Sequence, residues 1–326
     1  MEPAELRNYL GADWHKVESL MTETLTTDIQ LLAEVNGAVL RRGGKMLRPA
    51  VSLLMARACF GGSVTEDSIR VAAASQIMHN ATLLHDDVVD KSQERRGEPT
   101  VSSVLGDTPS VLIGDYWLVK AVNMILPLAS DHNDLVSMFA TTLSNLAEGE
   151  MLQLQKAEVG DTSMDDYLRI IYNKTASLFE STCVSAAISV GADEVKRAAA
   201  REYGICLGMA FQIRDDILDY TGSGLGKPVG VDLRERKITL PLLGALSKVD
   251  DERNRLVRGM VCGIEEHPEY VERITDFVHS EGGILFAEDR LEEFAHKAVE
   301  ALSPLPDSKD KELLCELAMY NVTRKK

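Results

Sequence analysis

Two clusters of three aspartates lie in otherwise apolar stretches of this 326-residue sequence. Both have the pattern DDxxD, and their members are Asp86, Asp87 and Asp90 in the first cluster and, 129 positions later, Asp215, Asp216 and Asp219 in the second. On a helix this spacing directs the carboxylates to one side within about one turn. Like charges held this close beside aliphatic neighbours require a cation to offset their repulsion and desolvation. We refer to the clusters as the first and the second acidic motif.

The ligand chemistry of the two motifs favours a hard metal ion. Both offer oxygen donors, without a cysteine or a pair of histidines beside them. Mg²⁺ that keeps several waters and is shared with a phosphate-bearing substrate fits such a donor set. In a chain with 51 acidic residues, one such cluster is more often a solvated helix end. Two copies, each followed by basic residues, favour a site in which both motifs face one diphosphate across a helical core.

Basic residues follow each motif closely. Arg95 and Arg96 come after the first motif, where they are either a surface ion pair worth about 0–1 kcal/mol or a clamp for phosphate, which their position before Gly97 favours. After the second motif, residues 221–237 are rich in glycine and contain Lys227 and Lys237. Because Lys227 is followed by proline, this segment is no Walker-type loop. We interpret it as a flap that closes over a bound diphosphate.

Further cations lie upstream and in the middle of the chain. Residues 40–49 join two predicted helices with four cations and two glycines, and can be either a solvated loop or a phosphate site that uses Lys45 and Arg48. His79 shares a helix face with Asp86, although a histidine there is by itself more often a core residue. Lys174 and Thr175 lie in an apolar region, where a lysine needs a partner such as phosphate.

The rest of the chain predicts a helical enzyme. Strand patterns are nearly absent, and apolar residues recur at helical spacing, with one helix predicted to end near Lys91. We expect an all-α fold, a helical bundle in a single domain over residues 1–326. The net charge of −16 argues against nucleic acid as a partner. Five scattered cysteines, no recognisable secretory signal and no 18-residue apolar run predict a cytoplasmic protein without a transmembrane segment.

These motifs together resemble those of the trans-isoprenyl diphosphate synthases, or polyprenyl synthetases, from about residue 35 to 245. In chain order they are GGKMLRP, LLHDDVVD with RRGEPT, GE with a following Q, KTA, FQIRDDILD and GKPVGVDLRERKITLP. The resemblance implies a bundle of the isoprenoid synthase type around a central cavity. One departure is Met46, where the family often has a basic residue, so that one phosphate contact is missing.

The resemblance also implies a role for each matching residue. Mg²⁺, with three ions per site, would be held on the allylic diphosphate by Asp86, Asp90, Asp215 and Asp219, with Asp87 and Asp216 in support. The same diphosphate would be bound by Arg95, Lys174, Gln212, Lys227 and Lys237, with Thr175 beside Lys174 in the KTA motif. Isopentenyl diphosphate would be bound by Lys45, Arg48, His79 and Arg96. The family implies farnesyl or geranyl diphosphate as the allylic partner, and a homodimer.

Product length is expected to depend on the residues that precede Asp86 on its helix. Thr82 lies one turn below, with Ala81 beside it and Met78 a further turn down, so no aromatic ring blocks the first turns. Family members with short products commonly have a bulky residue there. We therefore expect a chain beyond C20, with about C30 to C45 favoured, made for a quinone side chain. The alternatives are a class I terpene cyclase and a non-catalytic subunit of a heteromeric synthase.

Overall fold

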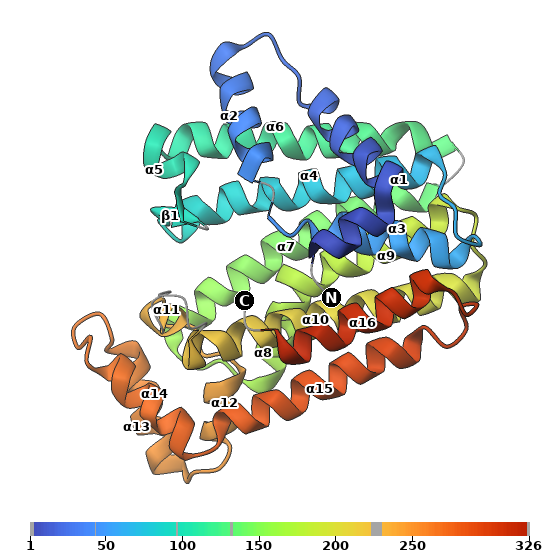
Figure 1. Ribbon diagram of the computed structural model, residues 1–326. Coiled ribbons are helices and arrows are strands. Elements are labelled where there is room, and N and C mark those ends of the chain that lie inside the picture. Colours follow the sequence, from blue (N-terminus) through green and yellow to red (C-terminus); the bar gives the residue numbers. More distant parts are fainter. Residues whose placement is uncertain (1–2, 43, 96, 131–132, 223–229, 325–326) are drawn as a thin grey trace. The chain divides into compact units, whose positions relative to one another are not determined.

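The computed structural model describes residues 3–42, 44–95, 97–130, 133–222 and 230–324 (Figure 1). Nearly all regular structure is helical, as predicted. The elements are α1 (Pro3–Thr24), α2 (Gln30–Arg42), α3 (Leu47–Cys59), α4 (Glu66–Val89), β1 (Glu94–Arg95), β2 (Glu98–Pro99), α5 (Val101–Leu105), α6 (Asp107–Ile125), η1 (Leu126–Ser130), α7 (Asn133–Val159), α8 (Met164–Ile171), η2 (Tyr172–Ala176), α9 (Ser177–Ser189), α10 (Glu194–Thr221), α11 (Val231–Arg234), α12 (Leu240–Leu246), α13 (Asp251–Cys262), α14 (Tyr270–Ser280), α15 (Gly283–Ala301) and α16 (Lys309–Thr323).

The helices form two compact units, each built from separate parts of the chain. The first unit contains residues 1–140, 181–200 and 305–314, and the second contains residues 141–180, 201–304 and 315–326. The first acidic motif belongs to the first unit and the second acidic motif to the second. The expectation of a single domain over residues 1–326 stays a prediction.

Helix α4 is the central helix of the first unit and packs against α1, α3 and α6. Thr65 begins it with a capping box, in which its side chain accepts from the backbone N–H of Ser68 and the Ser68 hydroxyl accepts in return. Every residue from Val71 to Met78 is buried. Burial on all sides explains why this stretch has no charged residue on any side of the helix, whereas the acids of α4 lie in its first turn and at its C-terminal end.

Helix α6 lies beside α4 (Figure 1), and a glycine allows the close approach. A Cβ on Gly114 would lie 2.3 Å from Nε2 of His85, so the imidazole fills the space that any other residue at 114 would need. The hydroxyl of Ser110 donates to the Leu84 carbonyl over 2.9 Å and fixes the start of α6 against the end of α4. These contacts hold the last turn of α4, which carries Asp86 and Asp87.

The core of the second unit surrounds α12, whose seven residues Leu240–Leu246 are all buried. Helix α12 packs against α14 and α15, and α10 contributes apolar side chains that include Ile213 and Ile217 to the same core. Ile213 and Ile217 flank Asp216 on α10. The second acidic motif is therefore held on a helix whose apolar face packs into this core, and Asp216 is buried on that face.

One hairpin of two-residue strands departs from the purely helical expectation. Glu94 pairs with Pro99, and Arg95 pairs with Glu98, in an antiparallel arrangement. Strands of two residues are too short to produce an alternating pattern, so the sequence contains no signal for them. The hairpin directly follows the first acidic motif and carries Arg95.

Helix α6 and η1 form an apolar segment that meets the length and composition of a membrane span. The most apolar 18-residue window of Asp107–Leu128 has a mean hydropathy of 1.4, and 39% of that window is buried. The core helix of a soluble protein passes the same test. The sequence prediction of no transmembrane segment stays a prediction.

Candidate active site

The first acidic motif lies at the C-terminal end of α4. Asp86 and Asp87 are in the last turn, and Asp90 is the C-cap, with its backbone N–H bonded to the Asp86 carbonyl at 2.8 Å. Asp87 is buried, while Asp86 and Asp90 are partly exposed. The helix therefore ends within the motif, close to the predicted end at Lys91, and Asp86 and Asp90 lie on the more open side.

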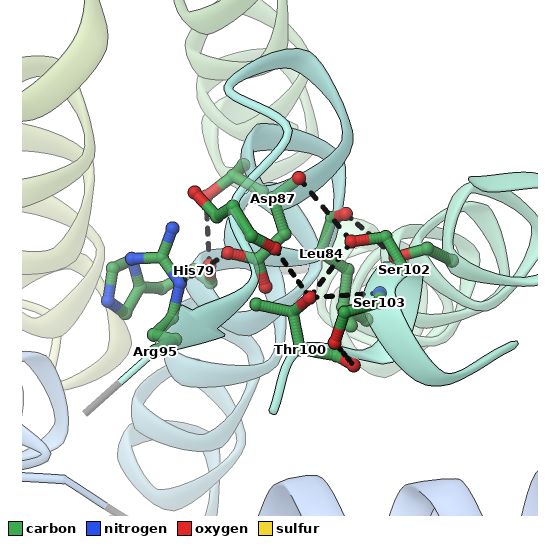
Figure 2. Close-up of polar contacts among 10 residues, drawn as sticks. His79, Leu84, Asp87, Arg95, Thr100, Ser102 and Ser103 are labelled. Atoms are coloured by element: carbon green, nitrogen blue, oxygen red, sulfur yellow. Dashed lines mark hydrogen bonds and ion pairs between the residues drawn. The ribbon is translucent and has the colours of Figure 1, made fainter. Parts of the chain in front are cut away.

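Asp87 is held by Arg95 from the hairpin (Figure 2). Nε of Arg95 donates to Oδ1 of Asp87 over 2.6 Å. Burial raises the pKa of Asp87 above its usual 3.8, although the neighbouring Arg95 charge and hydrogen bond act in the opposite direction. The side chain of Thr100 accepts from the N–H of Ser103, and its hydroxyl donates to the Ser92 carbonyl over 2.7 Å. Thr100 thus anchors the hairpin that presents Arg95.

A cavity of about 120 Å³ lies beside Asp87 in the first unit. Its polar lining is Asp87, Arg95, Arg42, Glu98 and Asn80, and its apolar lining is Val39, Leu83, Leu84 and Val101. Nε of Arg42 lies 3.2 Å from a carboxylate oxygen of Glu98, so both guanidinium groups of the cavity face acids. Sequence reasoning counted Arg42 among the cations of residues 40–49 but gave it no role.

Three of the four residues predicted to bind isopentenyl diphosphate are described by the structure, and all three belong to the first unit. Lys45 is exposed just before α3, Arg48 is buried in the first turn of α3, and His79 is partly buried on α4. The backbone of Met46 adopts the left-handed conformation (φ 44°) at the N-cap of α3. Arg96 lies outside the described residues. Their shared role stays a prediction.

The second acidic motif lies on α10, and its middle member is the most buried. Asp216 accepts two hydrogen bonds, one from the Tyr167 hydroxyl over 2.6 Å and one from Nε2 of Gln212 over 2.9 Å. Oε1 of Gln212 in turn accepts from the Thr175 hydroxyl over 2.7 Å. Burial raises the pKa of Asp216 from 3.8 to about 7, despite these two hydrogen bonds. The sequence singled out Gln212 and Thr175, but Tyr167 gave no signal.

Asp219 bonds to the backbone of α11. Its two carboxylate oxygens accept from the N–H groups of Val231 and Asp232 over 3.0 and 3.1 Å, and its carbonyl accepts from Gly230 over 2.9 Å. Burial raises the pKa of Asp219 above 3.8, and the two backbone hydrogen bonds partly offset the increase. Asp232, which has no role in the sequence-based prediction, places another carboxyl group beside Asp219. Burial and the neighbouring Asp216 and Asp219 raise its pKa well above the usual value.

Asp215 is the most exposed member of the second motif, yet it has a buried partner. Nη2 of Arg324 lies 2.6 Å from Oδ1 of Asp215. Arg324 has no role in the sequence-based prediction. Beside them, burial and the charge of Arg324 lower the pKa of Arg214.

Lys174 lies in η2, a single turn of π-helix. Its Nζ lies 2.5 Å from a carboxylate oxygen of Glu150 on α7. The two segments come close because residue 149 is glycine: a Cβ there would lie 2.7 Å from Cβ of Asn173. The sequence predicts phosphate as the partner of Lys174. In the structure Lys174 has an additional partner, the carboxylate of Glu150 in the same unit.

The cations that follow the second acidic motif are described only in part. Lys237 forms a very short ion pair with Glu235, and its backbone N–H donates to the Asp232 carbonyl over 2.8 Å. Lys227 lies outside the described residues. The flap proposed from the sequence therefore stays a prediction.

Comparison with known proteins decides the family of this site. A family model described as polyprenyl synthetase matches residues 29–278. The octaprenyl diphosphate synthase of Haemophilus influenzae is 37% identical over 325 residues, which cover 98% of this chain and 96% of the relative. This chain belongs to the polyprenyl synthetase family.

Two further matches support the assignment. The geranyl-diphosphate-specific all-trans-nonaprenyl-diphosphate synthase of Rhodobacter capsulatus is 36% identical and covers 97% of this chain and 96% of its own. A polyprenyl synthase from Caulobacter crescentus CB15, solved with calcium and isoprenyl diphosphate, is 34% identical, with a TM-score of 0.91 over 100% of this chain and 98% of its own. The isoprenoid synthase fold and a long-chain trans-polyprenyl diphosphate synthase activity follow.

Synthases of this family condense isopentenyl diphosphate with allylic diphosphates and depend in general on magnesium. The acidic motifs of this chain fit such an ion, because burial raises the pKa of Asp87, Asp216 and Asp219 and a divalent cation would relieve that cost. Among the described side chains, no three of His, Cys, Asp or Glu lie close enough to hold a metal by themselves.

The residues predicted to set product length lie on α4 where expected. Ala81 and Met78 are fully buried, as is Ala74 one turn further down. Thr82 is partly exposed, and its hydroxyl donates to the His79 carbonyl over 2.8 Å. The described part of α4 below Asp86 carries no aromatic residue in these turns.

Proposed function

We propose that this synthase makes a linear all-trans prenyl diphosphate of about C30 to C45, with eight or nine isoprene units favoured, from isopentenyl diphosphate and farnesyl or geranyl diphosphate. The observation that carries the length is the set of small or flexible side chains below Asp86, namely Ala81, Met78 and Ala74. The octaprenyl and nonaprenyl products in the names of two relatives point the same way.

The two acidic motifs serve one diphosphate in this proposal. Asp86, Asp90, Asp215 and Asp219 are the metal ligands, Asp87 and Asp216 support them, and three Mg²⁺ ions are bound per site. Bound Mg²⁺ neutralises the departing diphosphate and so promotes its loss from the allylic primer. Because both Asp86 and Asp90 lie at the open end of α4, they can reach a ligand without unfolding the helix.

The cations of the chain bind and orient the two substrates. Lys174, Lys227 and Lys237, with Arg95 and Gln212, hold the allylic diphosphate, and Thr175 holds Gln212 in place through its 2.7 Å hydrogen bond. Lys45, Arg48, His79 and Arg96 hold isopentenyl diphosphate. The apolar wall of α4 keeps water away while the isopentenyl double bond attacks the allylic carbon. The released diphosphate can accept the proton that is then lost, so no protein base is needed.

A homodimer is the proposed assembly. Leu112, Val119 and Leu126 recur at seven-residue spacing on α6 and η1 and are 62, 58 and 48% exposed. Val111 on α6 and Val104 on α5 are also exposed. An apolar stripe of this length fits a second copy of the same helix. Replacing both Leu112 and Val119 by Glu should then give a monomer in sedimentation, and an unchanged dimer would refute this interface.

The proposed location is the cytoplasm, and the proposed use is a quinone side chain. All five cysteines are free thiols, and Cys59, Cys183 and Cys206 are buried, which suits a reducing compartment. Fractionation of cells that express a tagged chain would test the location.

One assay tests the activity and its alternatives together. The purified chain is incubated with Mg²⁺, farnesyl diphosphate and labelled isopentenyl diphosphate, and the dephosphorylated prenols are separated by chromatography. We expect linear C30 to C45 prenols, and Ala81→Phe should shorten them while Ala81→Ser, a small control, should not. A cyclic hydrocarbon would indicate a cyclase, no turnover would indicate a partner subunit, and an unchanged length in Ala81→Phe would refute the tunnel assignment.

A further inference from the structure

Arg324 is a buried cation placed on the second acidic motif. It follows α16 directly, and the whole residue is only 5% exposed. Its Nη2 donates to Oδ1 of Asp215 over 2.6 Å and to the Phe211 carbonyl over 2.9 Å. The guanidinium also lies over the Phe211 ring, 4.0 Å from the centroid. All these partners belong to α10 and lie within one turn of each other.

The backbone of Arg324 is held at the same place. Its carbonyl accepts two hydrogen bonds from the side chain of Arg214, from Nε over 2.7 Å and from Nη2 over 2.5 Å. Two guanidinium groups, those of Arg214 and Arg324, are therefore packed near each other although their charges repel. The carboxylate of Asp215 is the group that compensates for this cost.

The three acids of the second motif have partners of different kinds. Asp216 accepts from neutral side chains and Asp219 accepts from backbone N–H groups, whereas Asp215 is paired with a full positive charge. Of the three acids, only Asp215 would bring a divalent cation next to a positive charge, because the Arg324 guanidinium is already in contact with its carboxylate. A guanidinium and a metal ion cannot both neutralise one carboxylate without repelling each other.

We infer that Arg324 is the resident counter-ion of the second acidic motif: it occupies Asp215 while no metal is bound, and binding of metal with diphosphate displaces it. This inference rests on the proposed role of Asp215 as a metal ligand. Arg324 is a positioning residue in this scheme, because it acts on the metal through Asp215. Its displacement also frees the end of α16 from α10, so the C-terminal segment responds to the arrival of substrate.

Metal binding without turnover tests the inference directly. Mn²⁺ is titrated against the full chain, without substrate, and bound and free ions are counted by electron paramagnetic resonance. Arg324→Gln, which keeps a hydrogen-bond donor but loses the charge, should bind Mn²⁺ about fivefold more tightly or better. Arg324→Lys, which keeps the charge, should stay close to the natural chain. Arg290→Gln removes an exposed arginine from α15 of the same unit and is the matched control, with no change expected.

Two further measurements locate the effect. In the double variant Asp215→Asn with Arg324→Gln the gain in Mn²⁺ affinity should disappear. In the natural chain, hydrogen exchange of the peptide from Cys315 to Arg324 should become faster when Mg²⁺ and inorganic pyrophosphate are added together. A gain in affinity cannot come from a merely loosened fold, because unfolding weakens metal binding.

The inference is overturned if Arg324→Gln binds Mn²⁺ as the natural chain does, or more weakly, with an unchanged circular dichroism spectrum. It is also overturned if the gain persists without Asp215. These results are separate from the prenyl assay. If the natural chain makes no prenyl product but Arg324→Gln still gains Mn²⁺ affinity, the proposed function is contradicted and the counter-ion role of Arg324 is supported. If the natural chain makes prenyl product but Arg324→Gln gains no Mn²⁺ affinity, the proposed function is supported and the counter-ion role is contradicted.

Discussion

The two acidic motifs share one spacing but neutralise their middle acid in different ways. Asp87, at the end of α4, is paired with the guanidinium of Arg95. Asp216, five residues before the end of α10, accepts hydrogen bonds from Tyr167 and Gln212, which are both neutral. A repeated sequence pattern thus gives two middle acids with different electrostatics. The middle acid of the first motif has its own counter-charge, whereas the middle acid of the second motif depends on protonation or on an added cation.

The difference follows from what surrounds each helix. The first motif is at a helix end, so a hairpin directly after it can bring a charged side chain to Asp87. Asp216 is buried where α10 packs into the core of the second unit, and its hydrogen-bond donors come from α8 and from α10 itself, so a charged partner for it would be costly. Hydrogen bonds from neutral donors are the less costly way to satisfy a buried carboxyl group there.

The largest effect is expected from removing one ligand of each motif. Asp86→Asn and Asp215→Asn should each lower prenyl transfer by about 10²–10³-fold, because each removes charge that stabilises the departing diphosphate in the transition state. Single-turnover incorporation of labelled isopentenyl diphosphate measures the rate. Asp307→Asn, on a fully exposed acid, is the control. Near-normal rates in one of the two variants would show that the motifs do not share one substrate.

The raised pKa of Asp216 predicts an unusual dependence of stability on pH. The carboxyl group loses its proton near pH 4 in the unfolded chain and near pH 7 in the fold. Between these values the folded chain binds the extra proton, so the free energy of unfolding contributed by Asp216 falls as the pH rises, by at most about 1.4 kcal/mol per unit. Below pH 4 the Asp216 carboxyl group is protonated in both states and causes no loss of stability, and above pH 7 the loss of stability has reached its full size.

Urea unfolding with EDTA, from pH 4.5 to 7.5, compares the natural chain with Asp216→Asn. The stability of the natural chain relative to the variant should fall across this range, because the variant lacks the raised pKa of Asp216 and the part of the raised pKa of Asp232 that Asp216 causes. A constant difference would show that Asp216 does not titrate in this window. The same comparison at Asp87 should give a smaller trend, because Arg95 favours its charged form.

Removing the counter-charge of the first motif should have an intermediate effect. Arg95→Gln leaves the buried Asp87 without its cation, and we expect a loss of about 1–2 kcal/mol in the free energy of unfolding, reduced because Arg95 is a third exposed. Thermal unfolding with EDTA measures it. Arg42→Gln, whose ion pair with Glu98 is more exposed, is the matched comparison and should cost less. Equal losses would mean that burial of Asp87 is unimportant.

The smallest effect is expected from one neutral donor of the second motif. Tyr167→Phe removes the hydroxyl that donates to Asp216 and leaves Gln212, so about 1 kcal/mol should be lost at pH 7.5. Tyr172→Phe removes a hydroxyl that donates to the more exposed Glu180 over 2.7 Å and should cost less. If the two variants were equally stable, Asp216 would not depend on neutral donors.

The sequence predicted the parts of the site that local spacing determines. The acids lie on α4 and α10, the helices that their spacing predicted, and α4 ends near Lys91 as expected. The roles of Gln212 and Thr175 are implied by the family resemblance and stay predictions. The all-α class followed from the same periodicity. The hairpin escaped detection because its strands have two residues each.

Partners that are distant in sequence could not be predicted from spacing. Tyr167 reaches Asp216 across 49 positions, and Arg324 reaches Asp215 across 109. Asp232 lies in the glycine-rich segment 221–237 and Arg42 lies in the basic segment 40–49. No sequence pattern distinguishes either residue from the charged residues beside it. Only the packing of helices brings such residues to the motifs, and a single sequence carries no signal for it.

The wide turn of η2 has a consequence for how this chain tolerates change. In it the N–H of Ser177 bonds to the carbonyl of Tyr172, five residues back, so the turn holds one residue more than an ordinary helix. Deleting a single residue there would restore regular α-helical winding. The residues on one side of the deletion would then rotate by about 100° about the helix axis relative to those on the other side. Lys174 would then lose Glu150, or Thr175 would lose Gln212. Insertions and deletions at this point should therefore be far more harmful than substitutions.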